Sequence, residues 1–177
     1  LDFQPETFTL TAPDGRAFTI RGPGDNSPGR LTSIADLNGN TLEFRDSGMY
    51  HSAGPAILFS RDGEGRITSV TDPLGAAVLY EYDASGNLVK VTSRRGFAST
   101  YTYDDAHNML TSNDPAGVGY VYEYDENGRV IAMVDGEGNR REMEYDTAGR
   151  QQISKDPQGN PLILTYDEKG RVIAKTD

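Results

Sequence analysis

Carboxylates are the side chains of this sequence most able to do chemistry. The chain has 27 Asp and Glu residues, two histidines (His51 and His107) and no cysteine. The segments Asp125-Glu126-Asn127-Gly128 and Asp135-Gly136-Glu137-Gly138 resemble calcium loops in composition. An EF-hand, however, needs a bidentate Glu at its twelfth position, and none follows at that distance. The sequence also has no Ser-His-Asp pattern, Gly-rich phosphate loop or metal-binding histidine pair. We therefore expect no metal, no cofactor and no catalytic residue, and predict that the protein is not an enzyme.

The aspartates recur with a period of 21 residues, which gives them a different role. A Tyr-Asp dipeptide is repeated, and a glycine follows three residues after the aspartate, with His107 in one glycine slot. Aspartate at a strand end accepts hydrogen bonds from N–H groups two or three residues on, and glycine supplies the positive φ of a type I turn plus bulge or a primed turn. His107 is interpreted as a turn residue that tolerates the left-handed region. The predicted structural motif is Tyr82, Asp83, Gly86, Tyr103, Asp104, Tyr124, Asp125, Gly128, Tyr145, Asp146, Gly149, Tyr166, Asp167 and Gly170.

A second turn motif has the same period. It occurs as Asp72-Pro73-Leu74-Gly75 and again from Asp114, Asp135 and Asp156, with the degenerate Ser93-Arg94-Arg95-Gly96 in the remaining slot. The segments between turns are about six residues long and rich in Val, Ile, Thr and Tyr, which is typical of strands. Each 21-residue unit is therefore predicted to be one hairpin. Because a lone hairpin is marginal in water, the hairpins are expected to stack into an extended antiparallel sheet.

Alternation along the strands predicts one apolar face. In Val121-Tyr122-Glu123-Tyr124 the two tyrosines share a face and Glu123 points the other way. The other ladder residues are Tyr80, Tyr82, Tyr101, Tyr103, Met143, Tyr145, Leu164 and Tyr166. A second column holds Ile67, Leu88, Met109, Val130 and Val172 and is broken by Gln151. We expect this face to pack against neighbouring strands rather than to stack on sugar rings.

The amino-terminal third is less regular. Residues 1–57 are predicted to contain a hairpin around Ala12–Arg16, a loop from Gly22 to Pro28, and a degenerate repeat with a period-breaking insertion at about 46–56. Residues 58–177 are the regular repeats, which stop in mid-repeat. The start, Leu1-Asp2-Phe3-Gln4, has neither an initiator Met nor a signal pattern, so we expect a piece of a longer protein.

Charge excludes some classes of partner. The net charge is −10, whereas proteins that bind nucleic acid concentrate Lys and Arg. Because of this charge, nucleic acid is not an expected partner. No apolar run approaches the roughly 20 residues that span a bilayer.

The alternation of Tyr-Asp-x-x-Gly-Arg with Asp-Pro-x-Gly resembles the YD-repeat, or RHS (rearrangement hot spot), family of bacterial shell proteins, toxin-complex subunits and teneurins. The resemblance covers residues 61–177 well and 13–46 more loosely. It implies an all-β, spiralling sheet of hairpin repeats that is a segment of a hollow β-shell, in a secreted or cell-surface protein.

The resemblance leaves two functions open. The first is a structural scaffold whose partners are the remainder of the shell and an enclosed carboxy-terminal toxin or cargo. The second is cell-surface adhesion or carbohydrate binding, with a glycan or receptor as partner and residues 46–56 as the recognition segment. The self-cleaving aspartate motif that ends the family's toxin-bearing shells is not found here. As an isolated fragment the chain is expected to be a monomer or an edge-to-edge dimer.

Overall fold

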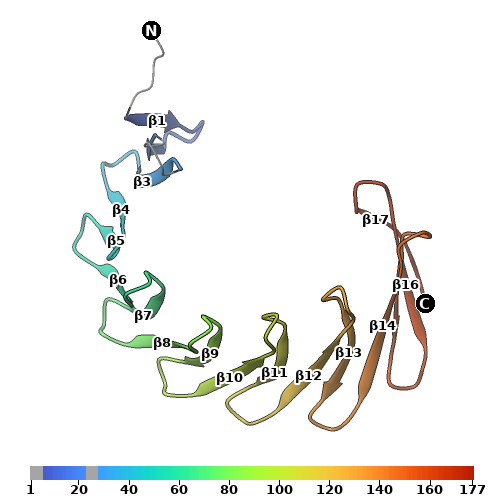
Figure 1. Ribbon diagram of the computed structural model, residues 1–177. Helices are drawn as coiled ribbons and strands as arrows, with labels where there is room; N and C mark the ends of the chain where they lie inside the picture. Colours follow the sequence, from blue (N-terminus) through green and yellow to red (C-terminus); the bar gives the residue numbers. More distant parts are fainter. Residues whose placement is uncertain (1–5, 23–27) are drawn as a thin grey trace. The chain divides into compact units, whose positions relative to one another are not determined.

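The computed structural model describes residues 6–22 and 28–177. These residues form 17 β-strands and no helix (Figure 1). The chain divides into two compact units, Leu1–Tyr80 and Glu81–Asp177. The predicted start at Leu1–Gln4 and residues 23–27 of the predicted loop lie outside the described residues. The described part of the chain has no helix long and apolar enough to cross a membrane.

The first unit is a series of hairpins in chain order. Each strand pairs antiparallel with the next. The hairpin predicted around Ala12–Arg16 is confirmed: β1 and β2 pair from Thr7↔Arg21 to Thr11↔Ala17. The strands are β1 (Thr7–Thr11), β2 (Ala17–Arg21), β3 (Arg30–Ala35), β4 (Thr41–Arg45), β5 (Gly48–His51), β6 (Ala56–Arg61), β7 (Ile67–Thr71) and β8 (Ala77–Tyr82), whose last two residues fall in the second unit.

The second unit has the same construction. Its consecutive strands also pair antiparallel. The prediction of an all-β fold of antiparallel hairpin repeats is therefore confirmed. The strands are β9 (Leu88–Thr92), β10 (Ala98–Tyr103), β11 (Met109–Asn113), β12 (Gly119–Tyr124), β13 (Val130–Asp135), β14 (Arg140–Asp146), β15 (Gln151–Lys155), β16 (Pro161–Tyr166) and β17 (Val172–Thr176).

The period-breaking segment is part of the sheet. β4 and β5 pair from Leu42↔His51 to Arg45↔Gly48, so only Asp46 and Ser47 connect them. Most other turns have three residues between the closing pair, so this turn shortens the repeat. Gly48 has φ +149°, and a Cβ there would lie 2.2 Å from the carbonyl oxygen of Ile57. Residues 48–51 of this segment thus form an ordinary strand of the array, β5, while the insertion and the domain boundary at residue 57 stay predictions.

Few side chains are buried in either unit because the strands form a single layer. Ala132 is the one hydrophobic side chain of the described residues that is fully buried. The expected column of apolar residues opposite the tyrosines is present: Tyr103 pairs with Met109, Tyr124 with Val130, and Tyr166 with Val172. The ladder tyrosines are half-buried rather than enclosed.

The opposite face of the second unit is charged. Arg140 pairs with Glu123 at 2.5 Å and with Glu142 at 3.1 Å. Lys155 pairs with Glu144. These side chains alternate along the strands with Arg141, Met143 and Tyr145, as expected for a sheet with one apolar and one polar face.

Candidate functional site

The repeated aspartates lie in turns that share one geometry. After β12, the N–H of Asp125 donates to the carbonyl of Arg129 at 2.9 Å, and the N–H of Gly128 donates to the carbonyl of Asp125 at 3.0 Å. Three residues separate this closing pair, and Gly128 has φ +75°. This is a type I turn followed by a left-handed residue that forms a bulge. The same two backbone bonds close the turns that begin at Asp62, Asp83, Asp104 and Asp167, and those of the second motif.

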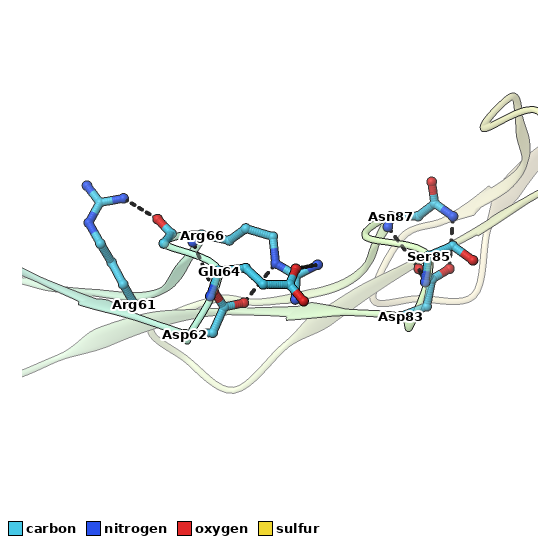
Figure 2. A network of polar contacts seen from close by, with 8 residues as sticks. Arg61, Asp62, Glu64, Arg66, Asp83, Ser85 and Asn87 are labelled. Atoms are coloured by element: carbon cyan, nitrogen blue, oxygen red, sulfur yellow. Dashed lines mark hydrogen bonds and ion pairs between the residues drawn. The ribbon is translucent and has the colours of Figure 1, made fainter. Parts of the chain in front are cut away.

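In five of the Tyr-Asp-type turns, those at Asp62, Asp83, Asp104, Asp125 and Asp167, both oxygens of the aspartate side chain accept hydrogen bonds within the turn. Asp62 Oδ1 accepts the N–H groups of Glu64 and Arg66 at 3.0 and 2.9 Å, and Oδ2 accepts Arg66 Nε at 2.7 Å. Asp83 does the same with Ser85 and Asn87, where Asn87 Nδ2 replaces the guanidinium at 2.9 Å (Figure 2). In these turns the residue four positions after the aspartate is Arg or Asn, and its side chain binds the second carboxylate oxygen.

These hydrogen bonds change the acidity of the turn carboxylates. The side-chain bond from Asn87 and the backbone N–H bonds lower the pKa of Asp83 below its usual value of 3.8. The bond from the Arg129 backbone, followed by that from its guanidinium, lowers the pKa of Asp125. Lowered pKa values mean carboxylates that stay ionised at neutral pH, unlike a general acid, whose pKa is raised toward the operating pH. Within residues 6–22 and 28–177, no group of three or more His, Cys, Asp or Glu side chains is placed to hold a metal ion.

The two histidines also have local roles. His107 has φ 65°, which confirms that it is a turn residue in the left-handed region. Its Nδ1 lies 2.6 Å from Asn87 Oδ1 in the preceding Tyr-Asp turn, one repeat earlier. His51 ends β5, and its Nδ1 accepts the N–H of Ala53 at 3.1 Å. His51 lines an open apolar hollow of about 350 Å³ with Leu42, Met49, Pro55, Ala56, Ile57 and Pro73.

The expectation of positive φ at Gly149 is wrong. The left-handed residue of that turn is Arg150, with φ 53°. Here β14 and β15 pair without a bulge, as Tyr145↔Gln152 and Asp146↔Gln151. Four residues, 147–150, then form the loop, and the left-handed position moves to the last of them. Among the described residues, Asp146 Oδ1 accepts only the N–H of Gly149, at 2.8 Å, instead of the N–H groups two and four positions on.

A glycine pair tests the role of the left-handed turn position. Gly128→Ala is expected to lower the free energy of unfolding by about 1 kcal/mol, because an L-residue at positive φ brings its Cβ against the following carbonyl. Crowding by other residues is not the cause, since the nearest atom to the new Cβ is Asn108 Oδ1 at 3.5 Å. Gly63 is the matched control: it has no positive φ and no neighbour within 4 Å.

Gly63→Ala is expected to change stability by no more than about 0.5 kcal/mol. Urea melts of both variants and the parent chain measure the difference. Equal effects of the two substitutions would contradict the assignment of Gly128.

The tyrosines bind the backbone of the preceding repeat. The hydroxyls of Tyr103, Tyr124 and Tyr145 donate to the carbonyls of Leu88, Met109 and Val130 at 2.9, 2.8 and 2.9 Å. Donor and acceptor are 15 residues apart in each case. Arg61, which stands where the tyrosine is lost, keeps this spacing: its Nε donates to the carbonyl of Asp46 at 3.1 Å. We call the hydrogen bond from a tyrosine hydroxyl to the carbonyl 15 residues earlier the hydroxyl lock. Among the described residues, Arg61 alone makes the equivalent bond with a guanidinium.

The lock forms where neighbouring strands stop pairing. β13 and β14 pair only from Val134↔Arg140 to Ala132↔Glu142. The carbonyl of Val130 therefore lies beyond the end of the ladder, and Tyr145 supplies its donor. An unpaired carbonyl away from water is costly, so tyrosine is favoured over phenylalanine here. Burial, followed by the neighbouring Tyr122, raises the pKa of Tyr124 above 10.0, so its hydroxyl keeps its proton.

A cation–π contact extends the connection between two repeats. The guanidinium carbon of Arg129 lies 4.9 Å from the ring centre of Tyr145, while Arg129 Nε donates to Asp125 Oδ2 at 2.8 Å. The turn of one repeat thus covers the tyrosine of the next. The site built by the predicted motif residues is structural: the aspartate and glycine shape each turn, and the tyrosine joins each repeat to the one before it.

An array of hairpins closed mainly by one kind of Asp–Gly turn and joined by tyrosines defines a β-hairpin repeat protein. The RHS Repeat family profile matches residues 61–98, 82–118 and 124–161, which together make up more than half of the chain. The chain therefore belongs to the RHS repeat family. No curated protein sequence matched it.

Solved structures share the fold. A crystal structure of TcdB2-TccC3 matches with a TM-score of 0.56 and 15% identity, over 95% of this chain and 12% of that one. The structure of a Photorhabdus luminescens Tc holotoxin pore with a mutant TccC3 matches with a TM-score of 0.53 and 16% identity, over 96% of this chain and 11% of that one. The chain thus spans about an eighth of the length of these proteins. Adhesion and carbohydrate binding are not favoured by these comparisons.

Proposed function

We propose that the chain is a structural wall segment of a larger, secreted RHS-repeat protein. The proposal rests on the observation that the repeated polar side chains form hydrogen bonds within and between the repeats themselves. The carboxylates of the turns bind their own backbone, and the tyrosine hydroxyls bind the preceding repeat. Such side chains extend and stiffen an array and leave few groups free for chemistry.

The likeness to Tc toxin proteins supports the wall role. The chain matches about an eighth of TcdB2-TccC3 along almost its whole own length, as a stretch of repeats within a longer array would. Its partners are then the preceding and following strands of the same shell, paired through the backbone. A secreted or cell-surface location follows from this role.

We further propose that the shell encloses a carboxy-terminal polypeptide, a toxin or other cargo. The resemblance to RHS-repeat proteins whose shells enclose a carboxy-terminal toxin motivates this step, while the residues of this chain carry no cleavage motif of their own. Enclosure predicts two polypeptides that stay together while the shell is folded.

Intact mass spectrometry of the full-length protein tests the enclosure. We expect a single particle under native conditions and a separate carboxy-terminal polypeptide that is released only on denaturation. A single uncleaved polypeptide under both conditions would contradict the enclosed cargo.

The isolated chain has its own expected behaviour. Among the described strands, β17 pairs with β16 alone, and all its residues are exposed. An open edge strand can pair with another chain, but the net charge of −10 opposes large assemblies. Sedimentation velocity in dilute buffer should therefore show a monomer or an edge-to-edge dimer, and long polymers would contradict this.

A further inference from the structure

The turn between β14 and β15 differs from the other Tyr-Asp turns although its sequence has the same parts. Asp146, Gly149 and Arg150 stand where Asp125, Gly128 and Arg129 stand in the regular turn. Nevertheless, the left-handed conformation is on Arg150 and not on the glycine beside it. A non-glycine residue in this region costs free energy. Something outside the turn must therefore favour the irregular form.

The main register of the hairpin does not explain the difference. Glu144 pairs with Ile153, which is the same register as Glu123 with Ala132 one repeat earlier. Only the end of the hairpin changes. In the regular form Tyr124 pairs with Val130 across a bulge, whereas Tyr145 pairs in step with Gln152. The two closures can therefore interchange without any slip of the sheet.

Residue 151 differs chemically from its counterparts. In the bulged closure the residue at this position lies opposite the tyrosine, and it is Met109, Val130 or Val172 in the other repeats of the second unit. An apolar side chain gains from packing there, whereas a glutamine amide loses hydration. Gln151 thus removes the packing that stabilises the bulge.

The in-step closure gives both glutamines a polar partner. Gln151 Nε2 lies 3.5 Å from Thr165 Oγ1, and Gln152 Oε1 accepts the hydroxyl of Tyr166 at 3.0 Å. The pairing of β15 with β16 then continues to Gln151↔Thr165. The N–H of Tyr166 donates to the carbonyl of Arg150 at 2.9 Å, and the Tyr166 hydroxyl binds the Gln152 side chain rather than a backbone carbonyl. A longer ladder and two amide contacts replace the bulge and the lock.

We propose that residue 151 selects the closure of this hairpin, and that the repeats can be converted between the bulged and in-step forms by this one position. Because a β-bulge increases the local twist of a sheet, the residue type at this position also sets the local twist of the array. Gln151 marks a repeat of reduced twist between regular neighbours.

NMR of the 177-residue chain tests the proposal. Three-bond couplings and backbone chemical shifts report which residue has positive φ. In Gln151→Val the positive φ should move from Arg150 to Gly149, and the side-chain amide of Gln152 should lose its contact with Tyr166. Arg150→Gly is the matched control, because it removes the cost of the left-handed arginine and should leave the in-step closure unchanged.

The reciprocal variant keeps the test decisive if Gln151→Val fails to fold. Val130→Gln should move the positive φ from Gly128 to Arg129 and release the hydroxyl of Tyr145 from the carbonyl of residue 130. If Arg150 stays left-handed in Gln151→Val, if Val130→Gln leaves Gly128 left-handed, or if Arg150→Gly alone produces the bulge, residue 151 does not select the closure.

Discussion

Tyr124→Ala is expected to lower the free energy of unfolding by about 3 kcal/mol, at the low end for truncation of an aromatic residue. The ring is half-buried and faces Val130 across the strand pair, so its removal exposes part of the apolar column. The hydroxyl lock to Met109 is lost at the same time. Urea unfolding followed by circular dichroism measures the change.

Two phenylalanine variants separate the ring from the hydroxyl. Tyr124→Phe keeps the ring and leaves the carbonyl of Met109 without its donor, so a loss of about 1 kcal/mol is expected. Tyr120→Phe is the control, because Tyr120 is 42% exposed and its hydroxyl makes no hydrogen bond within the described residues. If both phenylalanine variants are as stable as the parent chain, the hydroxyl lock contributes nothing to stability.

Acid is expected to unfold the array through its turns. Hydrogen bonds from the residue four positions on lower the pKa of Asp36, Asp62, Asp104, Asp135, Asp156 and Asp167 as well as Asp83 and Asp125. A carboxylate whose folded pKa lies below its unfolded value stabilises the fold above the unfolded pKa, near 3.8, and loses this contribution as the pH falls through the folded pKa. Stability should therefore be constant from pH 7 to about 5 and fall steeply below about 4.

Urea melts at several pH values test this dependence, with Asp125→Asn as the control. The amide keeps an oxygen acceptor for the turn but does not titrate, so this variant should be less stable at pH 7 and show a smaller loss in acid. A stability that falls already between pH 7 and 5, or stays unchanged down to pH 2.5, would contradict the role of the turn carboxylates.

Local chemistry made the hairpins predictable. Outside the turn at Asp146, each repeated aspartate contacts residues two and four positions away, and the turn glycine acts through its own φ. Such features depend only on nearby residues and therefore appear in the sequence as a motif. His107 was predictable for the same reason, since it stands in the slot where Gly86, Gly128 and Gly170 have positive φ.

Contacts between repeats were not predictable from the motif. The hydroxyl lock joins Tyr145 to a backbone carbonyl 15 residues earlier and depends on where the ladder between β13 and β14 stops. The signal in the sequence was the use of Tyr rather than Phe at the strand end. Arg61 in the same role shows why residue type alone misses it.

The prediction of positive φ at Gly149 failed for a related reason. The motif Asp-x-x-Gly-Arg is complete there, but the hairpin closes in step as Tyr145↔Gln152 and Asp146↔Gln151, and we propose that Gln151, after the turn, selects this closure. The break in the apolar column at Gln151 was visible in the sequence. Its effect on the backbone depends on how β14 and β15 pair, which the motif alone does not determine.

Electron cryomicroscopy of the full-length protein tests the central claim most directly. The wall role predicts that β1 to β17 are consecutive antiparallel strands within a closed shell, with further strands paired to the outer edges of β1 and β17. Finding these residues as a separate appendage, with both edge strands exposed to solvent and no shell around a cavity, would contradict the account.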